Sequence, residues 1–340
     1  WGPEDTDTLK QIYSDSSKKI YKTGSPRVDL WKETFSDYWK LKSSAIKKPF
    51  LLVSSSFSHA NNVRPLHERI KVFVDAGYYA RAPELLEKYF HRASEDYINT
   101  LAFVEAIKHL AKNNIGYDIV VRPHPTEYLE AWKTYLKDIS NVHIIREDSI
   151  TLWVKNAFAV MHHDCTTAIE AIICKTPVVT YSPHEMKNSK KLANELGYKV
   201  NSPSELLSRV NELYKLINNN NKNEIKKKLP DAVSKKIYID EELAAKKMMN
   251  VWEEITDSNF TKFNNLIKFK LILRLLNFKE KIFKLFNMNN SRPDRLSPKF
   301  DQLDINDVRD RILKFKNILG IKEEIECSLI SDKTIFIKKR

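Results

Sequence analysis

Glycine is scarce in this chain, which has only 6 Gly among its 340 residues. Loops that cradle a phosphate with backbone N–H groups need several glycines close together, because only Gly lets the backbone approach a ligand so closely. Neither G-x-G-x-x-G nor G-K-[ST] occurs in the sequence. The chain therefore lacks both the P-loop and the common dinucleotide-binding fingerprint.

Cysteine is also scarce, and its pattern excludes two kinds of site. The three residues Cys165, Cys174 and Cys327 are odd in number and show no C-x-x-C spacing. Three cysteines with this spacing do not indicate a disulfide framework or a structural zinc site. Such low cysteine usage is typical of proteins in a reducing compartment. We expect Cys165 and Cys174 to be small residues of the core.

Long apolar runs are missing as well. No stretch approaches the roughly 18 apolar residues of a membrane-spanning helix, and the first residues do not resemble a signal peptide. We therefore expect a cytoplasmic protein. The sequence starts at Trp1 within what reads as a folded segment, so we interpret it as a fragment of a longer chain.

What the chain has in excess is positive charge, with a formal net charge of +13. This balance implies an anionic partner, and nucleic acid, anionic lipid and nucleotide phosphate all qualify. The charge is concentrated in 261–290, where seven Lys and Arg residues stand against Glu280, a balance of 7 − 1 = +6. Phe, Leu and Ile interleave with these cations. The stretch therefore either lies on an anionic membrane surface or packs on its own domain with Lys stems covering the core.

Short apolar runs alternate with helical patterns from Pro49 onward. We expect strands at 49–54, 117–121, 142–146, 157–163 and 177–181, and helices at 83–113, 127–138, 150–155 and 166–174. Such alternation is the signature of a parallel sheet covered by helices on both faces. The sequence predicts a doubly wound α/β fold.

The patterns before residue 49 and after residue 185 do not show this alternation of strands and helices. Before the first strand we expect a helix over 4–20, a short strand over 20–24 and a helix over 30–42. Beyond residue 185 the chain becomes helical and basic, with helices expected at 241–255 and 305–319 and a short tail after them.

Polar side chains follow four of the five predicted strands. They occupy 54–62, 122–125, 162–167 and 181–185. Because ligands of an open parallel sheet bind outside the carboxyl ends of its strands, we expect these segments to form one site. Hydroxyls, imidazoles and guanidinium groups suit phosphate, so the sequence predicts a nucleotide pocket.

Candidate roles in this pocket follow from chemistry. Ser55 and Ser56 line it, Thr166 and Thr167 offer hydroxyls at a helix start, and Glu170 accepts hydrogen bonds from a ribose diol. Arg122 and His124 neutralise a diphosphate or phosphodiester. His124, Glu127 and Asp164 are the candidates for a catalytic base or nucleophile.

Each candidate also has a purely structural alternative. Thr167-x-x-Glu170 matches the capping box, and Asp164 is a candidate N-cap. His162, His163 and Cys165 suggest a metal, but neighbouring strand residues point to opposite faces, so we predict no metal site.

Four segments carry a resemblance to a known family. Arg122-Pro123-His124-Pro125 resembles the R-P-H-P of CDP-glycerol glycerophosphotransferases and capsule β-Kdo transferases. Residues 162–171, followed by 175–181, resemble the bacterial surface carbohydrate biosynthesis proteins, whose usual form is close to I-H-H-N-C-T-T-x-x-E-A…G-K-P-V-I-S-Y. Residues 23–29 resemble that family's T-G-N-P-R-x-D, and 51–62 resemble its first C-domain strand and loop. The resemblance covers about residues 1–185.

The resemblance implies a glycosyltransferase with two Rossmann domains, the GT-B fold, acting in capsule or lipopolysaccharide synthesis. Residues 1–48 would end the N-terminal domain, 49–257 would bind the nucleotide sugar, and 258–340 would be a basic helical extension. A CMP-activated ulosonic acid such as Kdo is the donor it favours, and a glycan or lipid-linked molecule is the acceptor. No cofactor or metal is implied, because helix dipole and basic groups neutralise the phosphate.

The same resemblance assigns individual residues. His124, Thr166 and Thr167 would hold donor phosphate, and Glu170 the ribose. Two positions depart from the family: Asp164 stands where Asn is usual, which brings a carboxylate near phosphate, and 54–56 are Ser where the family has N-T-N. The N-terminal Rossmann domain would lie upstream of Trp1.

The sequence alone leaves other functions open. A CDP-glycerol-type polyol-phosphate transferase shares the R-P-H-P motif, and a nucleotide-sugar epimerase shares the fold. A basic nucleic-acid-binding protein would explain the charge alone, but the sequence matches no nucleic-acid recognition motif.

Overall fold

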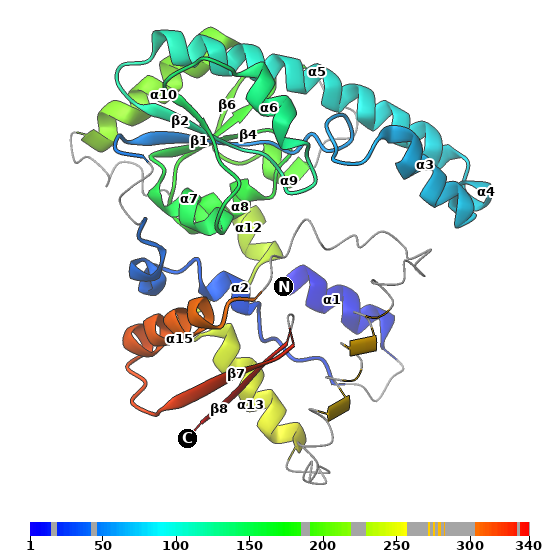
Figure 1. Cartoon of the computed structure of the whole chain (residues 1–340), viewed down its shortest axis with the longest axis vertical. Helices are drawn as coiled ribbons and strands as arrows, with labels where there is room; N and C mark the ends of the chain where they lie inside the picture. The colour runs from blue at the N-terminus through cyan, green and yellow to red at the C-terminus, as the bar shows by residue number, and fades with distance from the viewer. Residues whose placement is uncertain are drawn as a thin grey trace. The chain divides into compact units, whose positions relative to one another are not determined.

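A computed structural model describes residues 1–14, 19–41, 46–184, 191–218, 229–256, 271–272, 275, 278–279, 282, 303–331 and 334–339. The chain divides into two compact units (Figure 1). We call Trp1–Ala244 the sheet unit and Ala245–Arg340 the C-terminal unit. The predicted division at residues 48 and 257 stays a prediction.

The sheet unit is built on six parallel strands. They are β1 (Phe50–Ser54), β2 (Asp118–Arg122), β3 (Val142–Ile144), β4 (Ala159–His162), β5 (Val178–Tyr181) and β6 (Tyr198–Val200). Their order across the sheet is β3-β2-β1-β4-β5-β6. The predicted doubly wound α/β fold is confirmed.

Helices cover both faces of this sheet because the strands are apolar on both sides. Leu51 and Val53 pack into one core cluster, whereas Phe50 and Leu52 pack into another. Figure 1 shows α5, α6 and α10 on one side of the sheet and α7 and α8 on the other. The bounds of these helices are α5 Glu84–Asn113, α6 Leu129–Tyr135, α10 Pro203–Asn218, α7 Ile150–Asn156 and α8 Thr167–Ile173.

Shorter helices complete the sheet unit. They are α1 (Pro3–Ile12), α2 (Pro26–Asp29), α3 (Leu66–Asp75), α4 (Tyr78–Arg81), α9 (Lys191–Asn194) and α12 (Asp231–Lys236). Two 3-10 turns, Glu33–Phe35 and Asp37–Trp39, precede β1.

Two expectations for the start of the chain were wrong. Residues 20–24 form no strand, and the described residues of the helix predicted over 30–42, which end at Leu41, contain the two 3-10 turns instead of one helix. Trp31, Phe35, Tyr38 and Trp39 of this segment are buried. The Trp39 ring N–H donates to the Leu30 carbonyl at 2.7 Å, and this tertiary contact folds the segment back on itself.

Strand β6 was missed in the sequence because it has only three residues, one of them Lys199. Its pairing with β5 places it at the edge of the sheet. Gly197, with φ +76°, turns the chain into it.

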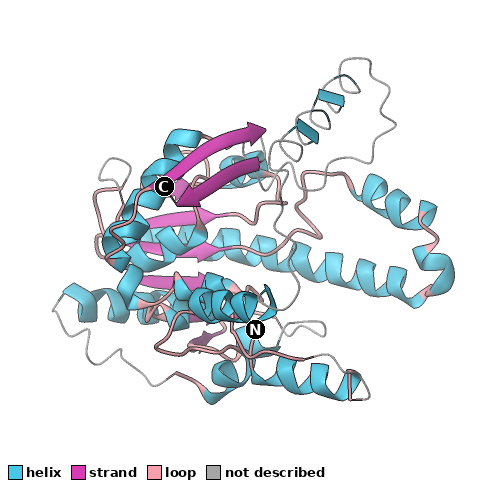
Figure 2. Cartoon of the chain, turned by 90° about the horizontal axis from the view of Figure 1, so that it is seen from below, coloured by secondary structure: helices cyan, strands magenta, loops and turns pink. Residues whose placement is uncertain are grey.

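The C-terminal unit contains most of α13 (Ala244–Thr256), α15 (Ile305–Leu319) and an antiparallel hairpin of β7 (Ile325–Ser331) and β8 (Thr334–Lys339). Figure 2 shows the hairpin as two antiparallel arrows beside the C-terminus. Helix α15 matches the helix predicted over 305–319, whereas the short tail predicted after it forms this hairpin, which the prediction of a helical extension did not include. The period-two alternation of Ile325, Cys327 and Leu329 was the overlooked signal.

The basic stretch 261–290 lies mostly outside the described residues. The six that are described are Leu271, Ile272, Leu275, Phe278, Lys279 and Ile282, all exposed. Within the part of the chain that the structure describes, no helix is long and apolar enough to cross a membrane.

Candidate functional site

The strand register brings the predicted polar segments to one edge of the sheet. Ser54, the last residue of β1, pairs with Arg122 of β2 on one side and with His162 of β4 on the other. His162 in turn pairs with Thr180 of β5. The loops after these strands therefore leave the sheet together, at what we call the carboxyl edge.

The strand order decides where on this edge a ligand would bind. In the order 3-2-1-4-5-6 the winding direction reverses between β1 and β4, and open α/β sheets bind ligands in the crevice at that reversal. Here the reversal is flanked by Ser55 and Ser56 after β1 and by residues 163–167 after β4. Ser55, Ser56, Asp164, Thr166 and Thr167 therefore lie beside the topological switch point, whereas Arg122 and His124 follow β2, one strand away.

Ser55 is held by a buried carboxylate. Its hydroxyl donates to Glu127 Oε2 at 2.8 Å, while Phe57 N and Trp132 Nε1 donate to the same carboxylate at 2.9 and 2.7 Å. Glu127 is fully buried, and this burial raises its pKa from 4.5 to about 7 against the opposing effect of these donors. Glu127 therefore joins the loops after β1 and β2, and the Ser55 hydroxyl is engaged inside the protein. Ser56 is half-buried beside it.

Asp164 is paired with an arginine that no sequence pattern singled out. Arg92, on α5, lies 2.8 Å from Asp164 Oδ2 and 3.2 Å from Asp96 Oδ1, and His59 Nδ1 lies 3.0 Å from Asp96 Oδ2. Asp164 is buried in the left-handed region, with φ +49°. Its charge is thus compensated by Arg92, which accounts for the carboxylate at this position. Asp164 is not the N-cap of α8, which is Thr166.

The two adjacent histidines point to opposite faces, as predicted. His162 Nε2 lies 2.8 Å from Thr180 Oγ1, and burial lowers its pKa to about 3. His163 Nδ1 lies 3.1 Å from the Tyr181 carbonyl, and burial lowers its pKa as well. Both are therefore neutral side chains with structural partners. Across the described ranges, no group of three or more His, Cys, Asp or Glu side chains is placed to hold a metal.

The start of α8 differs from the predicted phosphate cradle. Thr166 is exposed at the N-cap, and its side chain makes no capping hydrogen bond. Thr167 is buried, and its hydroxyl accepts from Ser54 Oγ at 3.1 Å and from Cys165 Sγ at 3.2 Å. The capping-box interpretation is therefore wrong. Because α8 has only seven residues, its dipole is weak and Thr166 is the hydroxyl it presents.

Glu170 lies one turn into α8 and is almost fully buried. Its carboxylate accepts a hydrogen bond from Thr151 Oγ1 on α7, and Arg27 Nη2 lies 3.6 Å from Oε2. Burial raises the pKa of Glu170, and the Thr151 hydrogen bond and the Arg27 charge oppose that rise. Arg27 itself is 60% exposed and covers the Glu170 carboxylate from the solvent side.

Arg122, the last residue of β2, is held by the loop that follows β3. Its guanidinium donates to the carbonyls of Glu147 and Asp148, and burial lowers its pKa to about 10. The charge of Glu170 raises its pKa slightly and the charge of Arg146 lowers it. Arg146 belongs to the same loop and donates to the loop after β2, so we call Arg122 and Arg146 the arginine cluster. The sequence pattern indicated only Arg122; Arg27 lay in the quoted segment 23–29, and Arg146 ended the predicted strand 142–146.

His124 has a defined orientation next to this cluster. Its Nδ1 accepts from Thr126 N at 3.3 Å and lies 2.7 Å from Thr126 Oγ1, so in the neutral ring the proton sits on Nε2. Arg146 donates to the Pro125 carbonyl and holds the same loop. His124 is half-buried, and its Nε2–H is a hydrogen-bond donor rather than an acceptor.

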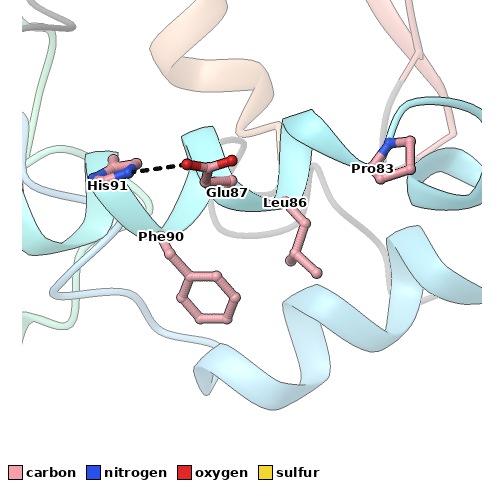
Figure 3. Close-up of a pocket in the computed structure, with 5 residues that line it drawn as sticks. All are labelled: Pro83, Leu86, Glu87, Phe90 and His91. Atoms are coloured by element: carbon pink, nitrogen blue, oxygen red, sulfur yellow. Dashed lines mark ion pairs between the residues drawn. The ribbon is translucent and has the colours of Figure 1, made fainter.

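A surface groove elsewhere on the sheet unit is distinct from this site. It has a volume of about 490 Å³ and is lined by Pro83, Leu86, Glu87, Phe90 and His91, near the start of α5. Figure 3 shows Leu86 and Phe90 pointing toward a neighbouring helix, and Glu87 joined to His91 by an ion pair of 3.6 Å. The carboxyl edge contributes no residue to this groove.

Comparison with known proteins yields distant structural similarity only. The chain is similar to a protein from Listeria monocytogenes described as a UDP-N-acetylglucosamine 2-epimerase, with a TM-score of 0.41 and 13% identity over 75% of this chain. It is also similar to the UDP-GlcNAc 2-epimerase of Methanocaldococcus jannaschii, solved with UDP-GlcNAc and UDP, with a TM-score of 0.34 and 15% identity over 73% of this chain. The match spans 59% of each of those proteins.

No protein-family model matches the chain, and the search of curated proteins finds no match either. At these TM-scores and identities, we take neither solved structure as evidence for function. Functional inference for this chain therefore rests on the strand order and on the side chains at the carboxyl edge.

Proposed function

We propose that the sheet unit is the nucleotide-sugar-binding domain of a GT-B glycosyltransferase that makes bacterial surface polysaccharide. The observations that support this most directly are the Arg27–Glu170 pair and the arginines Arg122 and Arg146 at the carboxyl edge of the sheet. Guanidinium groups bind phosphate oxygens, and a carboxylate beside them accepts from a ribose diol, so the two together match a nucleotide.

In the proposed complex, the phosphate of the donor lies against Arg122, the His124 Nε2–H and the exposed Thr166 hydroxyl. The ribose hydroxyls bind Glu170 in place of its 3.6 Å contact with Arg27, whose exposed side chain turns to the phosphate. Charge neutralisation by these groups stabilises the nucleotide as a leaving group. The chemistry calls for neither a metal nor a cofactor.

The catalytic candidates differ in what they can supply. His124 presents a donor near the phosphate and therefore suits leaving-group stabilisation. Asp164 is buried and paired with Arg92, and Glu127 is buried among three donors, so both suit positioning better than proton abstraction. We propose that the base which activates the acceptor belongs to the N-terminal domain implied by the family resemblance.

Calorimetry with CMP, CDP, UDP and GDP tests this proposal. We expect a cytidine nucleotide to bind best, and we expect Arg27→Gln, His124→Ala and Thr166→Ala each to weaken it by about tenfold, the effect of losing one charge-assisted hydrogen bond. Lys133→Gln, which removes an exposed cation from α6, is the matched control and should leave the affinity unchanged.

The outcomes separate the alternatives. A clear preference for UDP would favour an epimerase-type activity, and CDP binding without CMP binding would favour polyol-phosphate transfer. Equal and feeble binding of all four nucleotides would contradict the nucleotide pocket itself.

We also propose that 261–290 docks the protein on an anionic membrane, where lipid-linked acceptors are made. Leu271, Leu275, Phe278 and Ile282 are exposed and follow one another at helical spacing, which supports an apolar face beside the cations. Co-sedimentation with anionic liposomes should fall when 261–290 is deleted; unchanged co-sedimentation would contradict this docking.

A further inference from the structure

Helix α5 exposes an apolar patch at its middle. Tyr97, Ile98 and Leu101 are 56%, 49% and 63% exposed, whereas Phe103 and Ile107 on the other side are fully buried in the core of the sheet unit. An amphipathic helix normally turns polar side chains to solvent. Three large apolar neighbours on the outer face therefore indicate a surface that is covered by something.

Nine of the exposed residues of α5 form one line, at 84, 87, 91, 94, 98, 101, 105, 108 and 112, which are three or four positions apart and thus share one face of the helix. Lys88, Phe90, Tyr97 and Asn113 are exposed outside this line. Ile98 and Leu101 of the apolar patch lie at the centre of the line. Acidic residues, Glu84 and Glu87, lie toward the N-terminus, and basic residues, Lys108 and Lys112, lie toward the C-terminus.

This arrangement is complementary to itself when one copy is reversed. About a two-fold axis near Ile98, Glu84 of one copy faces Lys112 of the other, and Glu87 faces Lys108. His91 faces Glu105, and Leu101 lies opposite the small Ser94. A parallel pairing would instead place like charges together.

We infer that two copies of this chain associate through α5, packed antiparallel about a two-fold axis near Ile98. The same patch on both copies makes the contact, as closed two-fold dimers require. Within the sheet unit, α5 runs along the outer edge, with the sheet, α3 and α4 on its other side (Figure 1). The inference does not depend on the proposed function.

The geometry also sets the strength of the contact. The apolar part of this contact is only Tyr97, Ile98 and Leu101 of each copy, far less than the apolar core of a standard stable interface of roughly 1,200 Å² or more. The dimer should therefore dissociate on dilution in the micromolar range, and its affinity should fall with added salt because charge pairs flank the patch.

Cysteine cross-linking tests the two-fold register. We expect Ile98→Cys to form a disulfide-linked dimer on mild oxidation, because that position meets its own copy at the axis. Val74→Cys, equally exposed but on α3, should not cross-link, nor should the unchanged chain, whose Cys165 and Cys327 are buried. Glu84→Cys should cross-link to Lys112→Cys in a mixture but not to itself.

Sedimentation velocity tests the interaction without oxidation. Leu101→Asp should raise the dissociation constant at least about tenfold, because it buries a charge in the patch. Val74→Asp, the matched change on α3, should leave it unaltered. Glu87→Lys should weaken self-association, and mixing it with Lys108→Glu should restore a heterodimer.

Either of two results would overturn the inference. A chain that stays monomeric at all concentrations has no such interface. A dimer that persists in Leu101→Asp, with no cross-link at Ile98→Cys, uses another surface.

Discussion

At the residue scale, the site rests on buried groups whose pKa values move in opposite directions. Burial raises the pKa of Glu127 to about 7 and lowers that of His162 to about 3. Both groups are therefore biased toward neutrality inside the fold. Each lies beside a strand end and joins neighbouring segments: Glu127 the loops after β1 and β2, His162 the strands β4 and β5. Their protonation is coupled to the stability of the carboxyl edge.

Glu127→Gln should change how stability depends on pH. The folded pKa of Glu127 is raised, so the folded state holds this proton more tightly than the unfolded state does. The resulting stabilisation is present below about pH 4.5 and is lost as pH rises to about 7, by up to about 3 kcal/mol. Denaturant unfolding from pH 5 to 8 should show the wild type losing stability relative to Glu127→Gln.

The test compares the free energy of unfolding of the wild type with that of Glu127→Gln at each pH. His162 contributes the opposite slope, because its lowered pKa stabilises the fold above pH 6.5 and that stabilisation is lost as pH falls toward 3. Because His162 is present in both proteins, its contribution cancels when their free energies of unfolding are subtracted. Glu130→Gln, at an exposed position, is the control, and its free energy of unfolding should depend on pH as that of the wild type does. If the free energy of unfolding of Glu127→Gln also followed the wild type across this pH range, the buried carboxyl of Glu127 would be ionised throughout.

At the element scale, the sheet's last strand depends on one turn. Gly197 has φ +76°, and a Cβ placed there would overlap the Val178 carbonyl, next to the β5–β6 pairing. Gly77 has a similar φ of +67°, but nothing lies within 4 Å of its Cβ position. A substitution at Gly77 therefore measures backbone strain alone, whereas one at Gly197 measures strain and steric overlap together.

Gly197→Ala should destabilise the sheet unit by several kcal/mol, because both strain and overlap with the backbone of β5 act on it. Gly77→Ala should cost about 1 kcal/mol, the strain alone. Thermal unfolding of the two variants against the wild type measures the difference. Equal losses would mean that β5 shifts to accept the extra methyl group.

Element prediction succeeded where the pattern is local and strong. The strands at 49–54 and 177–181 and the helices at 83–113 and 305–319 match the structure within about two residues. It failed where a partner decided the conformation. Residues 30–42 have helical spacing, but a Trp39 side-chain hydrogen bond replaces part of the helix.

At the scale of the whole molecule, the two compact units are separable by their internal contacts. The core clusters of the sheet unit are made by residues up to Ile237 and the partners packed on them. Its stability should therefore not depend on the hairpin β7–β8 or on α15.

A chain ending at Thr256 should keep the folding of the sheet unit. We expect a cooperative thermal transition within a few degrees of that of the full chain. The same truncated chain should bind the preferred nucleotide unchanged. A broad, non-cooperative transition would show that the C-terminal unit is needed for the fold.

The sequence by itself determined the α/β class, most of the elements and the residues that lie at the carboxyl edge, because hydrophobic periodicity and strand ends are local features. Only the tertiary structure decided the strand order, and with it the switch point between β1 and β4. It also decided the partners: Arg27 for Glu170, Arg92 for Asp164 and Glu127 for Ser55. The physical reason is that these contacts join segments far apart in the chain, and no local pattern records which buried charge a distant arginine will neutralise.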